Sequence, residues 1–236
     1  MAVIRSNYKP PFWYRNAHWQ TIFPAVFRRL DPGIYTREKI FTADGDFLNL
    51  DWVRSGAQSC VILSHGLEGA SNRGYMLGMA NYLSNNGYDV CAWNFRGCGD
   101  EMNENLRMYH SGFTSDLQIV IDHIAKSYDQ IYLIGFSAGG NISLKYLGEN
   151  PAVVNSAIKA CIAFSAPTDL GACSKELEKP SNFIYQKRFL KLLGEKIVIK
   201  EQQFPEHVSS HKYNQLKTLR EFDDRYTAPF FGFKDA

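Results

Sequence analysis

Continuous apolar runs of strand length alternate with amphipathic segments through most of the chain. Four such runs occupy residues 60–65, 88–95, 130–136 and 158–166. Strands that are apolar on both faces are typical of parallel sheets covered by helices on each side. Residues 35–54 instead alternate between polar and apolar positions around a turn, which predicts an antiparallel hairpin. The pattern therefore predicts an α/β fold with a mostly parallel central sheet and an N-terminal hairpin.

The segments between the apolar runs have helical spacing. Residues 75–87 predict one helix that stops at Gly87, and residues 115–127 predict another, in which Ser115 and Gln118 fit a capping box. The buried face of this second helix is expected to consist of Leu117, Val120, Ile121 and Ile124. An earlier helix is expected at residues 17–29, broken or bent near a proline.

Beyond Ala166 the pattern changes to helical segments at residues 181–196 and 206–222, and no further buried strand is evident. We interpret residues 175–220 as a helical, cap-like excursion of a single domain that spans residues 1–236. The apolar residues of this excursion either line an acyl-binding cleft or simply cover the sheet: Phe183, Ile184, Leu190, Leu192 and Leu193.

The motif Gly135-Phe136-Ser137-Ala138-Gly139 lies directly between a predicted strand and a predicted helix. This G-x-S-x-G context is typical of a nucleophilic serine on a sharp, strained turn. Side chains two residues to either side would collide there, so glycines are required at both positions. The following helix points its free N–H groups at the same place, where they favour negative charge. An ordinary strand-to-helix turn is the alternative.

A glycine-rich loop, "SHGLEGAS", follows the strand at residues 60–65. The N–H groups of Leu67 and Ala138 are expected to form an oxyanion hole, which stabilises the charge that develops on an attacked carbonyl. His65 is interpreted as a residue that holds the shape of this loop, with a catalytic role as the lesser alternative. Loops above the sheet are also expected to be braced, by Arg96, Tyr109 and His110.

Composition and charge narrow the possible functions. The chain has 236 residues with a net charge of +2, which argues against a dedicated nucleic-acid binder. Its apolar runs are too short for an integral membrane segment, and its N-terminus lacks the features of a signal peptide. The five cysteines include no CxxC pair, which favours reduced thiols in a cytoplasmic protein. The scattered histidines predict no metal site, and no cofactor motif is present.

Several longer motifs resemble the YheT-like branch of the α/β-hydrolases, which also contains eukaryotic abhydrolase-domain lipases. They are "RNAHWQTIFP", "DGDFLNLDW", "SHGLEG", "NFRGCG", "YHSG", "GFSAGGNISLKYLGE" and "SAPTDL". The resemblance implies an α/β-hydrolase fold and hydrolysis of carboxylic esters, with a small-molecule acyl ester as substrate. It also implies that Ser137 is the nucleophile and that Leu67 contributes an oxyanion N–H.

The same resemblance implies a triad acid and a histidine beyond two further strands, which are expected to be missing from this chain. Asp169 is a weaker candidate for the acid, and His207 and His211 are weaker candidates for the base. Without further strands, residues 158–165 would form an exposed apolar edge that pairs with other chains. We therefore expect poor solubility or oligomers, and a stable monomer in light scattering would count against this expectation.

Two classes of function stay open at this point. The first is a serine hydrolase of the esterase or lipase type. The second is a catalytically impaired remnant that binds a ligand or partner in the same crevice. Acyl transfer or haloperoxidase-like chemistry on the same fold is a third possibility, because a fold does not determine a function.

Overall fold

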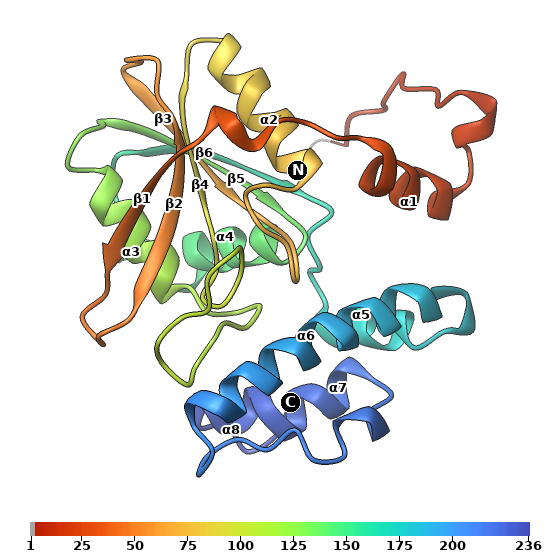
Figure 1. Ribbon diagram of the computed structural model, residues 1–236. Coiled ribbons are helices and arrows are strands. Elements are labelled where there is room, and N and C mark those ends of the chain that lie inside the picture. The colour runs from red at the N-terminus through yellow and green to blue at the C-terminus, as the bar shows by residue number, and fades with distance from the viewer. Residues whose placement is uncertain (1–2) are drawn as a thin grey trace.

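The computed structural model describes residues 3–236, in which a six-stranded sheet has helices on both faces (Figure 1). The strand order is β1-β2-β4-β3-β5-β6. Strand β1 pairs antiparallel with β2, β2 pairs antiparallel with β4, and the other neighbours are parallel. The strands are β1 (Thr36–Phe41), β2 (Phe47–Val53), β3 (Ser59–Ser64), β4 (Asp89–Trp93), β5 (Gln130–Phe136) and β6 (Ile158–Phe164). The predicted α/β class, the mostly parallel sheet and the N-terminal hairpin are confirmed.

Residues 3–236 also contain eight α-helices, some of which cover the sheet while others lie beyond its end. They are α1 (Ala17–Phe27), α2 (Gly74–Asn85), α3 (Ser115–Ile124), α4 (Ala138–Glu149), α5 (Leu170–Leu177), α6 (Phe183–Gln203), α7 (Leu219–Phe222) and α8 (Ala228–Phe231). Short 3₁₀ turns occur at Phe12–Tyr14, Pro32–Ile34, Pro151–Val153, Pro180–Asn182 and Tyr213–Gln215, and Asp223–Thr227 is a π-helical turn. Helix α1 is not broken at Pro24, which lies inside the helix.

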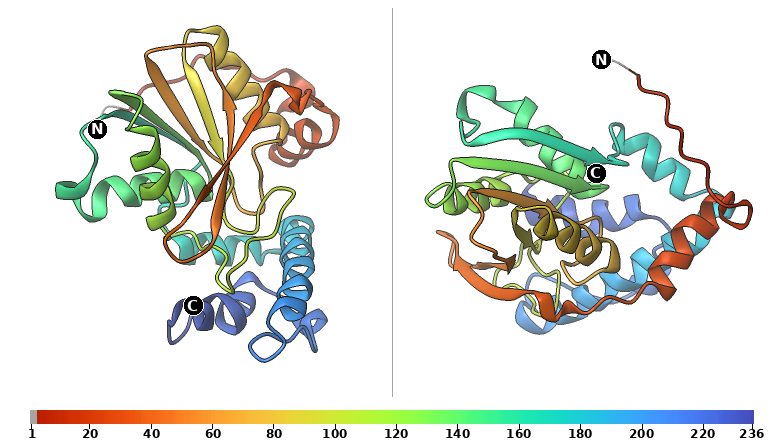
Figure 2. Two further views of the ribbon diagram at one scale, coloured as in Figure 1. Left: turned by 60° about the vertical axis from the view of Figure 1, so that its left-hand side comes forward. Right: turned by 90° about the horizontal axis from the view of Figure 1, so that it is seen from above.

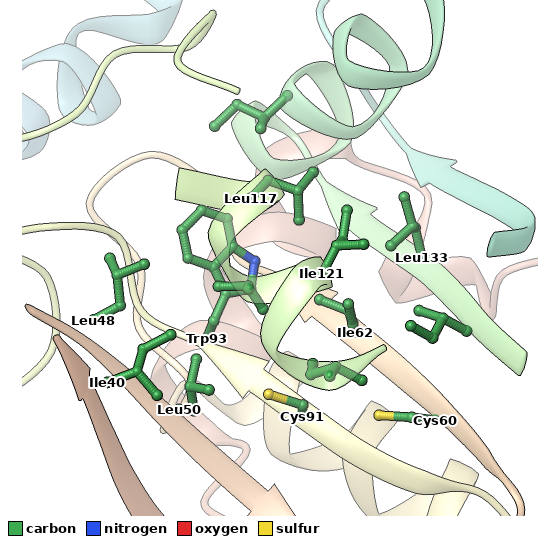
Figure 3. Close-up of a cluster of buried hydrophobic side chains, with 14 of the residues drawn as sticks. Ile40, Leu48, Leu50, Cys60, Ile62, Cys91, Trp93, Leu117, Ile121 and Leu133 are labelled. Carbon is green, nitrogen blue, oxygen red and sulfur yellow. The ribbon is translucent and has the colours of Figure 1, made fainter. Parts of the chain in front are cut away.

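Two apolar clusters lie on opposite faces of the sheet. Helices α3 and α4 cover the larger cluster, in which Trp93 and Ile121 are buried (Figure 3). Helix α2 covers the other face with Met76 and Ala80. The four residues predicted for the buried face of α3 are all buried. The expected capping box is wrong, because the N-cap of α3 is Thr114 and Gln118 donates a hydrogen bond to Asp122 instead.

Beyond β6 the described chain contains helices but no further strand, and it lies at the end of the sheet where the parallel strands finish (Figures 1 and 2). Helices α6, α7 and the following turns share a small core with the loop before α3, which contributes Met108. This core also contains Leu193 and Ile197. Leu190 packs against that core, whereas Phe183 and Ile184 are exposed. Residues 206–222 are mostly irregular, so the predicted long helix there is wrong.

Strand β6 is the last strand in the sheet of residues 3–236. Its side chains Ile162 and Phe164 are 52% and 41% exposed. An apolar edge of this kind offers unpaired backbone groups to another strand. Self-association of the 236-residue chain therefore stays a prediction, which light scattering over a range of protein concentrations tests. Ile162→Lys is expected to weaken the association, because a charge on an edge strand disfavours pairing.

Candidate active site

Ser137 occupies the turn between β5 and α4. Its backbone has a φ of 51° and a ψ of −117°, a conformation that residues other than glycine adopt only under constraint. Its N–H donates a 2.9 Å hydrogen bond to the carbonyl of Phe164, the last residue of β6. The side chain of Ser137 is exposed, while its neighbours in α4 are buried. The serine therefore projects from the end of the sheet at the N-terminus of a helix.

Two glycines permit this turn. A Cβ on Gly139 would lie 2.4 Å from the carbonyl oxygen of Ser64, at the end of β3. A Cβ on Gly135 would lie 2.4 Å from the carbonyl oxygen of Gly139. Both distances are far below van der Waals contact, and the atoms approached belong to the backbone. The close approach of β3, β5 and α4 at this point thus requires glycine at both positions.

The loop after β3 lies against the serine. A Cβ on Gly66 would be 3.3 Å from Cβ and 3.8 Å from Oγ of Ser137. Leu67 follows Gly66 directly, and Ala138 is the first residue of α4. Tyr75 of α2 supports the loop, because its hydroxyl accepts a 3.0 Å hydrogen bond from the N–H of Gly66. The backbone of the loop and the first turn of α4 therefore both lie next to the exposed residue Ser137.

The buried side chain of His65 stabilises the same loop through hydrogen bonds to the backbone. It is completely buried, its Nδ1 donates to the carbonyl of Gly66 at 2.8 Å, and its Nε2 accepts from the N–H of Phe95 at 3.1 Å. Burial lowers the pKa of His65 to about 3. Both ring nitrogens are thus engaged with the backbone, which agrees with the interpretation of His65 as a residue that fixes the loop.

The low pKa of His65 predicts an acid-sensitive fold. The unfolded chain takes up this proton near pH 6.5 and the folded chain only near pH 3, so stability is retained above pH 6.5 and lost as the pH falls. As the pH falls from 7 to 4.5, this histidine alone is expected to lower the free energy of unfolding by about 2–3 kcal/mol. Urea denaturation at several pH values measures the loss. His65→Gln should flatten the pH dependence, and exposed His207→Gln should leave it unchanged; equal curves for His65→Gln and wild type would refute the assignment.

Arg96 and Tyr109 brace the loops above the sheet, as predicted. The Arg96 guanidinium is buried and pairs with Asp116 at 2.8 Å, Asp44 at 2.7 Å and Asp46 at 3.1 Å. Although burial opposes its charge, the carboxylates of Asp116 and Asp44 raise the pKa of Arg96. One cation thus connects the hairpin turn, the loop after β4 and the start of α3.

His110 lies beside the C-terminal segment. Its ring packs edge-on against Phe231 at 4.5 Å, and its Nδ1 accepts from the N–H of Gly112 at 3.1 Å. Burial lowers the pKa of His110 to about 4. His110 therefore also has a bracing position, between the loop before α3 and the last helical turn.

A buried ion pair joins the loop at Ser137 to the helical region, and nothing in the sequence pattern predicted it. Lys196 of α6 donates to Glu68 at 2.8 Å, and the Tyr109 hydroxyl donates to the same carboxylate oxygen at 2.8 Å. The side chain of Glu68 is 2% exposed and its φ is 51°. Burial opposes the Lys196 charge, but Cys98 and Glu68 raise its pKa above the ordinary value. Glu68 directly follows Leu67, so this pair fixes the loop from the side of α6.

Breaking this pair is expected to destabilise the fold strongly. Lys196→Met leaves the Glu68 carboxylate buried without its cation, which typically costs about 3–5 kcal/mol. Lys191→Met is the matched control, because Lys191 lies on the same helix but is 76% exposed. Urea denaturation measures both variants. The double variant Lys196→Met/Glu68→Gln should lose less than the sum of the single changes; additive losses would contradict a direct pair.

The weaker triad candidates lie elsewhere. Asp169 is exposed and caps α5, accepting a 2.8 Å hydrogen bond from the N–H of Ala172. His207 and His211 are exposed in the irregular segment after α6. Within residues 3–236, none of the three forms a hydrogen bond with Ser137. A hollow of about 330 Å³ at His207 is lined by residues of the helical region and by Leu106 of the loop before α3, and its lining does not include Ser137.

The described residues show no metal-binding cluster and no membrane-spanning helix. Among residues 3–236, no three His, Cys, Asp or Glu side chains are grouped so as to hold a metal ion. In the same part of the chain, no helix has both the length and the apolar composition needed to cross a bilayer. The five cysteines are all free, and Cys60, Cys91 and Cys98 are buried.

The strand order, with antiparallel β2 and a serine turn after β5, defines an α/β-hydrolase fold. The family model described as serine aminopeptidase, S33, matches residues 55–221. YheT of Escherichia coli (strain K12), an esterase candidate by its name, is 30% identical over 239 residues, which cover 98% of this chain and 70% of YheT. The chain belongs to the α/β-hydrolase superfamily and, within it, to the YheT-like branch.

Other relatives agree with this assignment. Mouse phospholipase ABHD3 is 30% identical over 244 residues, which cover 98% of this chain and 59% of that protein. The chain thus spans about 60–70% of the length of these curated relatives. The solved structure of the Pyrococcus furiosus esterase Pf2001 has a TM-score of 0.53 and 25% identity, over 72% of this chain and 65% of that one.

Proposed function

We propose that the chain is a serine hydrolase that cleaves carboxylic esters, with Ser137 as the nucleophile. The observation that supports this most strongly is the exposed residue Ser137 at a φ of 51°, where β5 meets the N-terminus of α4. Esterase, phospholipase and monoacylglycerol lipase are the names of relatives, so acyl esters are the proposed small-molecule substrates.

In the proposed reaction, Ser137 Oγ attacks the ester carbonyl carbon, and the hydroxyl proton leaves with the alcohol. The negative charge that develops on the carbonyl oxygen would be stabilised by the N–H groups of Leu67 and Ala138, a contribution of about 2.7–4 kcal/mol for each donor. Water then cleaves the acyl-serine and releases the acid. The closeness of Gly66 to Ser137 supports this role for the neighbouring Leu67, since a Cβ on Gly66 would lie 3.8 Å from Ser137 Oγ.

A fluorophosphonate probe tests the proposal, because it reacts with a serine that the protein activates and does not require turnover. A serine hydroxyl without an activating base is a weak nucleophile, so the labelling rate is also a measure of activation. We expect peptide mass spectrometry to locate the adduct on Ser137. Ser165 provides an internal comparison, because it is also exposed and has a φ of 49°. An adduct on Ser165 and not on Ser137 would refute the assignment.

The second candidate is a non-catalytic remnant that binds a ligand or partner at the same place. It is favoured by the positions of Asp169, His207 and His211, none of which is hydrogen-bonded to Ser137 in residues 3–236. The same probe separates the two functions. No labelling of a folded chain would support the remnant, and labelling of Ser137 would support the hydrolase.

A further inference from the structure

The N-terminal arm, residues Val3–Leu30, contains no buried residue and is rich in apolar side chains. Ten of the 23 large apolar side chains that are exposed in residues 3–236 belong to it. Its helix α1 contains no buried residue, although most of its residues are apolar. In Figures 1 and 2, α1 stands outside the layers that cover the sheet. A large exposed apolar patch of this kind marks a surface that binds something else.

The apolar residues of the arm are largely aromatic. Phe12, Trp13 and Phe27 are 74%, 59% and 62% exposed, and Trp19 and Phe23 lie between them on α1. Aromatic side chains, Trp and Tyr above all, gather at the boundary between lipid head groups and acyl chains, because their rings suit both environments. The composition of the arm therefore fits a bilayer interface.

The charged residues of the arm are all basic. Positions 1–30 carry five of the 26 Lys and Arg residues and none of the 24 Asp and Glu residues. The five are Arg5, Lys9, Arg15, Arg28 and Arg29. All five are exposed, and the side chain of Arg28 also lies beside Gly78 of α2. Among the described residues none of the five pairs with a carboxylate, so this charge is available to an anionic partner.

The start of α6 extends the same face. His18 of α1 and Tyr185 of α6 stack and share a 2.9 Å hydrogen bond. Phe183 and Ile184, beside Tyr185, are 59% and 65% exposed, and Lys187 adds a further exposed cation. We call the arm together with Phe183–Arg188 the docking face.

We propose that the docking face binds the surface of an anionic phospholipid bilayer. Helix α1 has 11 residues and is about 16 Å long, against about 30 Å for the hydrocarbon core, so it would lie along the interface. Its aromatic residues would enter the head-group region while the basic residues contact lipid phosphates. A symmetric pairing of two copies through this face would bring two sets of basic residues together, which disfavours a second copy as the occupant. This proposal does not depend on the role of Ser137.

Vesicle flotation tests the proposal with the 236-residue chain. We expect binding to vesicles of 30% phosphatidylglycerol in phosphatidylcholine, and at least tenfold weaker binding to phosphatidylcholine alone. Lys9→Glu/Arg15→Glu should weaken binding at least tenfold, because each basic residue near an anionic surface contributes to the attraction. Lys126→Glu/Lys159→Glu, which changes the net charge equally at exposed positions outside the docking face, should bind like the wild type.

A second pair of variants tests the contribution of the apolar side chains to vesicle binding. Phe12→Ser/Trp13→Ser should reduce binding at least tenfold, and Phe41→Ser, at a 79% exposed aromatic on β1, should not. None of these residues is buried, so thermal unfolding should be unchanged in every variant. Equal binding by wild-type and docking-face variants would overturn the proposal. So would light scattering that shows a dimer dependent on Phe12 and Trp13 without any vesicle binding.

Discussion

Replacing Ser137 with alanine is expected to remove fluorophosphonate labelling, with a rate reduced by at least about 10³-fold. The change deletes only the hydroxyl and keeps the Cβ, so the turn at φ 51° retains its conformation. Thermal unfolding should therefore stay close to that of the wild type. Loss of labelling at unchanged stability would separate a chemical role of the hydroxyl from a structural one.

Ser165→Ala is the control for this experiment, because Ser165 shares the exposure and the positive φ of Ser137 but follows β6. The Ser165→Ala variant should be labelled on Ser137 at the wild-type rate. Labelling that persists in Ser137→Ala and disappears in Ser165→Ala would contradict the proposed nucleophile.

Gly139→Ala is expected to damage both the fold and the labelling. The new Cβ would lie 2.4 Å from the carbonyl oxygen of Ser64 and 2.5 Å from that of His65, and neither backbone atom can give way without moving β3 from α4. Overpacking of this kind costs about 1–3 kcal/mol or more. A shift of about 1 Å at a reacting group can cost about 10²-fold in rate, so labelling should fall by about that factor.

Gly148→Ala provides the matched control at the other end of the same helix. Nothing lies within 4 Å of a Cβ at this position, and the residue is exposed. Alanine there should stabilise α4 by up to about 1 kcal/mol and leave labelling unchanged. Thermal unfolding and labelling rates measure both variants. Similar effects of the two changes on stability and labelling would show that the close approach of Gly139 to β3 is not required for either.

The sequence was sufficient to predict the sheet, because each strand from β3 to β6 is a continuous apolar run between polar turns. It also predicted the turn at Ser137, since the two flanking glycines are local in the chain. The long helix expected at residues 206–222 fails because Lys212 takes a left-handed conformation. Helix α7 begins only at Leu219, and the capping box of its N-cap Thr218 with Glu221 is a local signal that was available.

The link between Glu68 and Lys196 could not be predicted from the pattern. The two residues are 128 positions apart, and a glutamate in a polar loop is ordinarily expected to be exposed to solvent. Its burial depends on where α6 crosses the loop, which only the folded chain defines. The same is true of the contact between His18 and Tyr185, which joins the arm to α6 across 167 positions.

The most direct measurement of the proposed chemistry is a crystal structure of the chain after reaction with a fluorophosphonate. The phosphonyl group stands in for the tetrahedral carbon of an attacked ester, and its oxygen stands in for the charged oxygen. The account predicts a bond to Ser137 Oγ, with the phosphonyl oxygen within about 2.7–3.1 Å of the amide nitrogens of both Leu67 and Ala138. A phosphonyl oxygen that faces solvent, or an adduct on a different residue, would contradict it.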